Sequence, residues 1–124
     1  MNSTTIIVLA VALIAVGFVF KRREGAAAII PEEEVRRDLS AGATVVDVRT
    51  PGEFAAGHAD GAINIPLNEV ARRADEFQSF SRPILVCCRT GRRSGGATLI
   101  LRRRGFEDVK NAGAYQRVVP RPDR

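Results

Sequence analysis

A strand-loop-helix pattern between residues 83 and 104 constrains the fold more than any other stretch of this chain. The apolar run Pro83-Ile84-Leu85-Val86-Cys87 has the length and composition of a short buried strand. A helical pattern follows from Gly95 to Arg104, and Ser94 is a suitable N-cap for it. The six residues from Cys88 to Arg93 are therefore predicted to form a tight strand-to-helix loop.

The composition of this loop predicts a reactive cysteine. Gly91 permits a backbone turn with positive φ, so successive N–H groups can face inward as an anion-binding nest. The helix that follows adds the positive end of its dipole, and Arg89, Arg92 and Arg93 add charge. Such groups lower the pKa of a cysteine and favour its nucleophilic thiolate form. The alternative is a buried structural cysteine that precedes an ordinary basic turn.

Strand and helix patterns alternate along the rest of the chain. This alternation predicts an α/β fold with a small parallel β-sheet flanked by helices. Function in such sheets lies at the carboxyl ends of the strands, where Asp47 and Cys88 both fall. We expect strands at residues 44–48, 62–65, 84–87 and 108–110, an edge strand at 29–30, and helices at 31–41, 51–56, 67–77 and 95–104.

Two motifs in this order and at this separation resemble the rhodanese-homology domain family. Cys88-Arg89-Thr90-Gly91-Arg92-Arg93-Ser94 is similar to the family's active-site loop. The run from Asp47 to Leu67 is similar to the signature D-V-R-x-x-x-E-F-x-x-G-H-I-x-G-A-x-N-I-P-L, with Ala59 in place of the usual Ile. A weaker similarity covers residues 109–114, where the chain has Gly-Ala in place of Gly-Gly and lacks the Trp that follows. The resemblance extends over residues 29–119.

The resemblance implies a catalytic role for Cys88. In this family the cysteine accepts a sulfane sulfur and forms a persulfide, whose anion the loop amides stabilise. The same loop implies a substrate-binding set, in which Arg89 and Arg93 would bind the sulfonate end of thiosulfate or another anionic donor. The alternative for these arginines is solvated surface charge. The full substrate-binding set is Arg89, Thr90, Gly91, Arg92, Arg93 and Ser94.

Supporting roles are expected for charged residues outside the loop. Asp47 and Arg49 lie at one strand end, where a carboxylate and a guanidinium usually pair and brace loops, and Glu53 is expected to join that network. His58 is the only His, and its position in the family is structural. Cys87 precedes the nucleophile, so its side chain should point to the opposite face of the sheet.

The N-terminal twenty residues form a separate compositional zone. The uncharged run from Ser3 to Phe20 would be about 27 Å long as a helix, which suffices for a bilayer core when flanking basic side chains reach the interface. Lys21-Arg22-Arg23 follows it, which by the positive-inside rule keeps the rest of the chain in the cytoplasm. A cleaved signal peptide is the alternative, but its basic residues would precede the apolar run. We expect a single-pass, N-out anchor over residues 1–23, a linker over 24–28, a domain over 29–119 and a flexible tail over 120–124.

Net charge and cysteine content indicate which binding partners, thiol redox state and cofactors to expect. The net charge is +5, yet the arginines are spread over several elements without interleaved aromatic residues, so no nucleic acid is expected. A membrane surface and a small anionic sulfur donor fit this charge better. Adjacent Cys87 and Cys88 are expected to be reduced thiols, because a bridge between neighbours would be strained. No standard metal-ligand spacing occurs, and neither a metal nor an organic cofactor is implied.

These observations favour one function over two alternatives. The chain is predicted to be a membrane-anchored sulfurtransferase that passes sulfur from thiosulfate or a persulfide, through Cys88, to a thiol or cyanide. A Cdc25-like phosphatase or arsenate reductase shares the cysteine-loop-arginine arrangement, but its loop is one residue longer. A non-catalytic scaffold module that binds a membrane protein is the other alternative. The retained cysteine and the arginine-rich loop weigh against it.

Overall fold

The computed structural model describes residues 2–8 and 26–119 of the 124-residue chain. The predicted anchor and basic stop lie mostly outside the described residues, as does the predicted tail. Residues 3–8 are helical. Within the described residues, none of the helices combines enough length with enough apolar character to cross a membrane.

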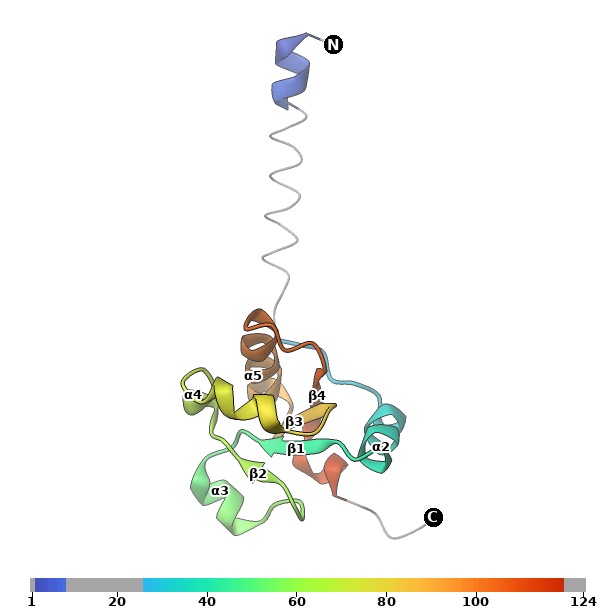
Figure 1. Ribbon diagram of the computed structural model, residues 1–124, viewed down its shortest axis with the longest axis vertical. Coiled ribbons are helices and arrows are strands. Elements are labelled where there is room, and N and C mark those ends of the chain that lie inside the picture. Colours follow the sequence, from blue (N-terminus) through green and yellow to red (C-terminus); the bar gives the residue numbers. More distant parts are fainter. Residues whose placement is uncertain (1, 9–25, 120–124) are drawn as a thin grey trace.

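Four strands form one parallel sheet in the order β2-β1-β3-β4 (Figure 1). They are β1 (Thr44–Asp47), β2 (Ile63–Asn64), β3 (Ile84–Cys88) and β4 (Val109–Ala114). The central strand β3 is buried at every position, as a strand covered on both faces should be. The register places Asp47 opposite Cys87, so the carboxyl ends of β1 and β3 meet at one edge. The predicted parallel α/β sheet is confirmed.

Helices cover both faces of the sheet. They are α2 (Glu32–Ser40), α3 (Pro51–Ala56), α4 (Leu67–Val70), the 3-10 helix η1 (Ala74–Ser79), α5 (Arg92–Arg103) and the 3-10 helix η2 (Tyr115–Val118). One core combines Val46, Ile84, Val86 and Cys88 with buried side chains of α4, η1 and α5. The other combines Val45, Leu85 and Cys87 with Val35 of α2 and Val118 of η2.

Two predicted elements differ in the structure. The helix expected over residues 67–77 divides into α4 and η1, where Phe77 is fully buried in edge-on contact with Phe80 and Phe106. Here core packing overrides the helical period. The strand expected over residues 108–110 extends to Ala114, because β4 continues past a register shift opposite Val86 and Cys87. Such an irregularity keeps the ladder going after an extra residue, which strand patterns do not reveal.

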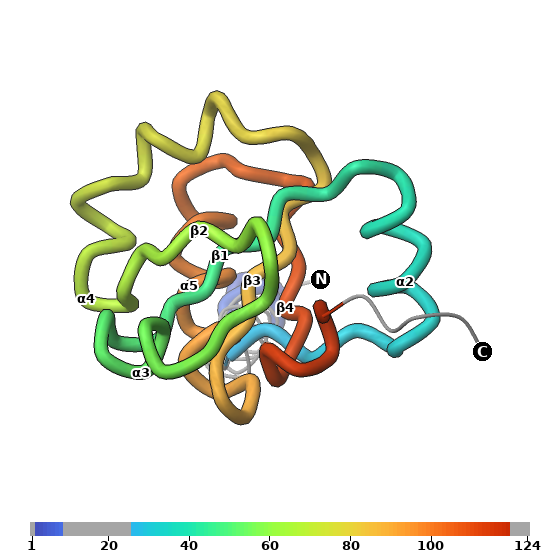
Figure 2. Tube along the Cα trace, turned by 90° about the horizontal axis from the view of Figure 1, so that it is seen from below, coloured from blue at the N-terminus to red at the C-terminus, as the bar shows by residue number. Residues whose placement is uncertain are grey.

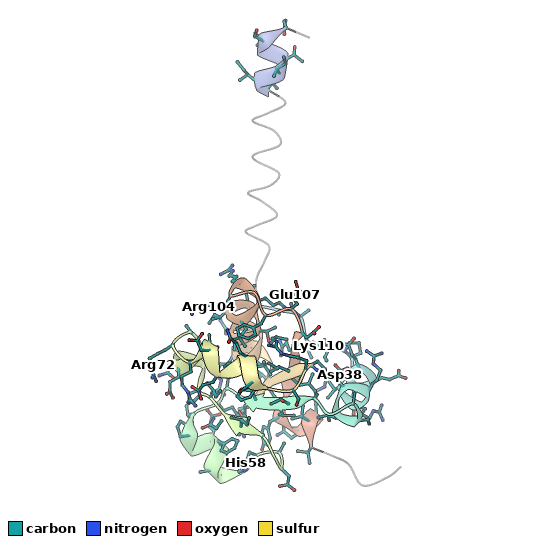
Figure 3. All side chains as sticks on the ribbon, in the orientation of Figure 1. Asp38, His58, Arg72, Arg104, Glu107 and Lys110 are labelled. Carbon is teal, nitrogen blue, oxygen red and sulfur yellow. The ribbon has the colours of Figure 1, made fainter. Side chains whose placement is uncertain are left out.

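The segment before α2 lies against β4. Ile29 forms an isolated parallel bridge with Asn111, and the Ile30 N–H donates to the Asn111 carbonyl at 3.0 Å. Figure 2 shows this segment running beside β4. Figure 3 labels Asp38 of α2 beside Lys110 of β4, whose ammonium donates to the buried carboxylate at 2.8 Å. Residues 26–30 and α2 therefore pack on the outer strand through both backbone and side-chain contacts.

Candidate active site

The connection from β3 to α5 is shorter than the sequence predicts. β3 runs to Cys88 and α5 begins at Arg92, so three residues link them rather than six. Gly91 has a φ of 94° and is the N-cap of α5, and its carbonyl accepts the Gly95 N–H at 3.0 Å. Only glycine adopts this left-handed conformation at little cost, so it sets the point at which the helix starts.

The Cys88 sulfur lies inside this turn. Its Sγ accepts the Gly91 N–H at 3.0 Å and lies 3.3 Å from the Ser94 hydroxyl. The residue has no exposed surface. The sulfur is therefore enclosed by the turn and by the start of α5.

Two opposing influences set the ionisation of Cys88. Burial is the largest single influence and raises the pKa of the thiol, because it penalises the charged form. Hydrogen bonds from the Ser94 hydroxyl and from the backbone N–H groups of Ser94, Thr90 and Gly91 act in the other direction. Together they outweigh burial, so the pKa of Cys88 lies below its ordinary value. The predicted anion-stabilising loop is thus present around the cysteine.

Ser94 is not the N-cap that its sequence position predicts. It lies inside α5 and is fully buried, and its hydroxyl donates to Asn111 Oδ1 at 2.7 Å. The hydroxyl is therefore held between Cys88 and β4 and is not available to cap the helix. Ser94 remains next to the sulfur, where the loop motif puts it.

Asp47 and Arg49 form a buried pair at the end of β1. Arg49 Nε donates to both carboxylate oxygens at 3.0 Å, and Nη2 donates to Oδ2 at 2.7 Å. Nη2 also donates to the Gly57 carbonyl at 2.7 Å, and the guanidinium lies 3.8 Å from the centre of the Tyr115 ring. These contacts tie the β1 end to the α3 region and to η2, and they engage both charges fully.

Glu53 pairs with Arg93 across two helices. Arg93 donates to both Glu53 oxygens, at 2.6 Å and 2.9 Å. Glu53 also completes a capping box with Thr50 at the start of α3. The Arg93 hydrogen bond is the main reason that the pKa of Glu53 falls to about 2. Glu53 thus braces α5 through its carboxylate and Arg93. Its backbone carbonyl also accepts a hydrogen bond from Arg49 Nη1 at 3.3 Å, so Glu53 contacts the Asp47–Arg49 pair as well.

The remaining loop residues face solvent. Arg89, Thr90 and Arg92 are exposed, and within the described residues neither arginine forms an ion pair. Both arginines follow Cys88 within four residues of the chain, so two positive charges without an acidic partner among the described residues belong to this segment. These charges can attract an anion more readily than Arg93, which is already paired.

Cys87 and His58 lie outside this arrangement. Cys87 belongs to the core on the opposite face of the sheet from Cys88, and burial raises the pKa of its thiol. His58 lies at the edge of the molecule beside α3 (Figure 3), where its Nδ1 is 2.7 Å from the Phe54 carbonyl oxygen. Its ring stacks on Phe54 with centroids 3.7 Å apart. Neither side chain contacts the Cys88 sulfur.

A surface hollow of about 360 Å³ is lined by residues such as Arg82, Arg104 and Phe106, which precede β3 or follow α5. It therefore lies at the amino ends of the strands, away from Cys88. Within residues 2–8 and 26–119, no three His, Cys, Asp or Glu side chains are grouped so as to hold a metal ion.

The sequence assigns no role to two residues that the structure brings to the site. Asn111 of β4 is buried and contacts the loop, and Tyr115 of η2 stacks on Arg49. Asn111 lies just after the strand predicted at residues 108–110, and the weaker family similarity over residues 109–114 is the only sequence signal that includes it. Tyr115 has no such signal, because its partner is 66 positions away in the chain.

Fold and site together define a class of protein. It is a parallel α/β domain in which a cysteine at the end of a central strand sits in a turn of backbone N–H groups beside a helix start. The comparisons with known proteins agree with this class. The chain matches the Rhodanese-like domain family over residues 32–115 and belongs to that family.

Individual relatives support the assignment. The chain is 38% identical over 82 residues to YqhL of Bacillus subtilis, an uncharacterised protein, and the match spans 66% of this chain but 64% of YqhL. It is 40% identical over 75 residues to the thiosulfate sulfurtransferase PspE of Escherichia coli, and this match covers 60% of this chain and 72% of PspE. The human single-domain sulfurtransferase TSTD1 superposes with a TM-score of 0.60 at 30% identity, over 73% of this chain and 94% of TSTD1. The family match and these named relatives are consistent with a thiosulfate sulfurtransferase.

Proposed function

We propose that this protein transfers a sulfane sulfur from thiosulfate or a persulfide, through a persulfide on Cys88, to a thiol or cyanide. The observation that carries the proposal is the Gly91 N–H directed at the Cys88 sulfur at 3.0 Å. Backbone donors aimed at a sulfur favour its anionic form and need no reorganisation during the reaction. The relatives named thiosulfate sulfurtransferases support the same reaction.

The proposed reaction has two displacements. The Cys88 thiolate attacks the outer sulfur of thiosulfate, a new S–S bond forms, and the S–S bond of thiosulfate breaks as sulfite leaves with its electron pair. The outer sulfur of the persulfide then carries the negative charge. In the second step an acceptor nucleophile attacks that outer sulfur, and Cys88 leaves as a thiolate. The N–H groups of the loop stabilise the anion in both steps.

We propose that the positive charges of Arg89 and Arg92 attract the anionic sulfur donor. Both are exposed beside Cys88, and neither has an acidic partner in the part of the chain that the structure describes. Arg93 is held by two hydrogen bonds from its guanidinium to Glu53, which favours a bracing role for it. An incoming sulfonate would have to compete with that carboxylate for Arg93.

The proposed site of action is the cytoplasmic face of a membrane. The support is sequence alone: the uncharged run from Ser3 to Phe20 is followed by Lys21-Arg22-Arg23. Such an anchor would keep the catalytic domain next to a membrane protein partner that supplies or receives sulfur. This part of the proposal is independent of the chemistry at Cys88.

Intact mass spectrometry of the full chain in detergent tests the chemistry. Incubation with thiosulfate should add the mass of one sulfur atom, and cyanide should remove it. Cys88→Ser should show no gain, whereas Cys87→Ala should retain it as a matched control. A folded, reduced protein that gains nothing from thiosulfate or glutathione persulfide would contradict the proposal. Turnover of a phosphate ester by such a protein would favour the phosphatase alternative.

A further inference from the structure

Asn111 connects the catalytic loop to two other parts of the domain. Its Nδ2 donates to the carbonyls of Gly91, at 2.9 Å, and Ala27, at 2.7 Å. Its Oδ1 accepts the Gly113 N–H at 3.0 Å and the Ser94 hydroxyl at 2.7 Å. The residue is only 1% exposed. Water therefore does not compete for these bonds, and each polar atom of the amide is satisfied by protein.

These partners define the orientation of the amide. Two carbonyl oxygens face the nitrogen, and a backbone N–H faces the oxygen, so a flipped amide would lose three hydrogen bonds. Asn111 Oδ1 is consequently an acceptor toward Ser94. The single proton of the Ser94 hydroxyl then points to Asn111, and a lone pair of its oxygen faces Cys88.

The Ser94 hydroxyl thus has two competing acceptors. The Cys88 sulfur lies 3.3 Å from Ser94 Oγ, and Asn111 Oδ1 lies 2.7 Å from it. A neutral sulfur is a weak acceptor, so Asn111 retains the proton when Cys88 is a thiol or the inner sulfur of a persulfide. A thiolate is a charged acceptor and competes strongly for the proton.

We propose that Asn111 is a positioning residue that holds the Ser94 hydroxyl proton while the Cys88 sulfur is neutral and yields it when the sulfur becomes a thiolate. Rotation of the Ser94 hydroxyl then gives the thiolate one more hydrogen bond. It does so at the two steps that involve a thiolate: before Cys88 attacks the sulfur-donating molecule, and when Cys88 leaves the persulfide. The inference rests on the proposed role of Cys88 as nucleophile.

The other charged and titratable groups around Cys88 cannot take the place of the Ser94 hydroxyl proton. Arg93 of α5 is paired with Glu53, and Asp47 of β1 is paired with Arg49. Cys87 of β3 has a raised pKa because of burial and stays a neutral thiol. Arg89 and Arg92 are exposed, so solvent and salt screen their effect on the sulfur. The Ser94 hydroxyl, in contrast, lies between two acceptors, the Cys88 sulfur and Asn111 Oδ1.

The test is the titration of Cys88 in the full chain, followed as the rate of alkylation at each pH and located by peptide mass spectrometry. Asn111→Ala removes the competing acceptor, so the midpoint for Cys88 should fall by about one pH unit. Asn64→Ala is the matched control. Its amide donates to the carbonyls of Asp47 and Arg49 and does not contact Ser94, so the midpoint should not move.

A double-mutant cycle distinguishes competition of Asn111 for the Ser94 proton from the support that Asn111 gives to the loop backbone. Ser94→Ala removes the mobile donor, so the midpoint should rise, and adding Asn111→Ala should then change nothing. A natively folded Asn111→Ala whose midpoint rises or stays constant would overturn the proposal. If that variant does not fold, Ser94→Ala decides, because an unchanged or lowered midpoint contradicts it. The titration uses no sulfur donor, so its failure is distinct from a failure to form the persulfide.

Discussion

The arginines around Cys88 carry equal charge but have different partners. Arg49 is buried with Asp47 and stacks on Tyr115, and Arg93 binds Glu53 through both carboxylate oxygens. Arg89 and Arg92 are exposed. At the scale of single residues, a guanidinium that already has a carboxylate is a brace, and one that has none is available to an incoming anion.

Substitution of the exposed arginines should weaken donor binding. Arg89→Gln and Arg92→Gln should each raise KM for thiosulfate by about 2- to 10-fold, because an exposed charge contributes up to ~1 kcal/mol or slightly more. The value of kcat should change little, and added salt should reduce the difference. Steady-state kinetics with cyanide as acceptor measures this. Arg36→Gln on α2 is the control, since it is exposed on another element. A KM effect confined to Arg93→Gln would contradict the assignment.

Gly91 is constrained by both conformation and space. Its φ is 94°, and a Cβ atom would lie 2.5 Å from Ile29 Cδ1. Gly91→Ala should therefore destabilise the domain by about 1–3 kcal/mol and slow persulfide formation. Adding Ile29→Ala should restore only part of the stability, because the φ strain remains.

Urea unfolding of the same chain provides the comparison. Gly96→Ala is a matched control within α5, where no atom lies within 4 Å of the added Cβ and the helical backbone favours alanine. It should be neutral or stabilising by about 0.5–1 kcal/mol. Equal stabilities for Gly91→Ala and Gly96→Ala would show that the turn tolerates a side chain.

At the scale of elements, the site is held by contacts between helices that are far apart in sequence. The Glu53–Arg93 pair joins α3 to α5, and the capping box of Thr50 orients Glu53. The segment before α2 reaches the start of α5, where the Ala27 N–H donates to the Gly95 carbonyl at 3.1 Å. The residues predicted as the end of a linker thus form part of the support for the loop.

The pair between α3 and α5 predicts a specific pH dependence. Because the pKa of Glu53 is lowered from 4.5 to about 2, the folded state holds its proton less tightly than the unfolded chain does. The stabilisation is complete above about pH 5 and is lost as the pH falls toward 2. The difference in Tm between the parent chain and Glu53→Gln should be constant above pH 5 and shrink below it. A difference that persists unchanged to pH 2 would argue against the ion pair.

At the scale of the whole molecule, the apolar N-terminal run predicts where the domain acts. The paired substitution Val11→Arg and Ile14→Arg should release the chain from membranes, because each charge at a helix centre costs about 2.5–3.5 kcal/mol on insertion. Fractionation of cells measures this. Val119→Arg, an exposed change at the end of the domain, is the control.

Orientation is a separate outcome of the same proposal. An N-terminal tag should be cleaved by protease added outside intact cells, while the domain should be protected. Protection of the tag together with cleavage of the domain would reverse the predicted orientation. A parent chain that fractionates with soluble proteins would contradict the anchor and leave the proposed chemistry at Cys88 unaffected.

The sequence by itself determines the local parts of this protein. Alternating strand and helix patterns predict the parallel sheet, and the glycine at position 91 predicts the turn that follows Cys88. These features depend on residues that are close in the chain, whose periodicity and allowed φ values are readable directly. The opposite placement of Cys87 and Cys88 follows from the same alternation.

Only the tertiary structure decided which side chains meet. Arg93 pairs with Glu53 forty positions away, and Ser94 binds Asn111 across the start of α5 and β4. Such contacts depend on strand register, on the irregularity in β4 and on where α5 begins, and no local pattern encodes these. The sequence therefore predicts the reactive cysteine and its loop, while the partners that tune and brace them emerge from packing between distant segments.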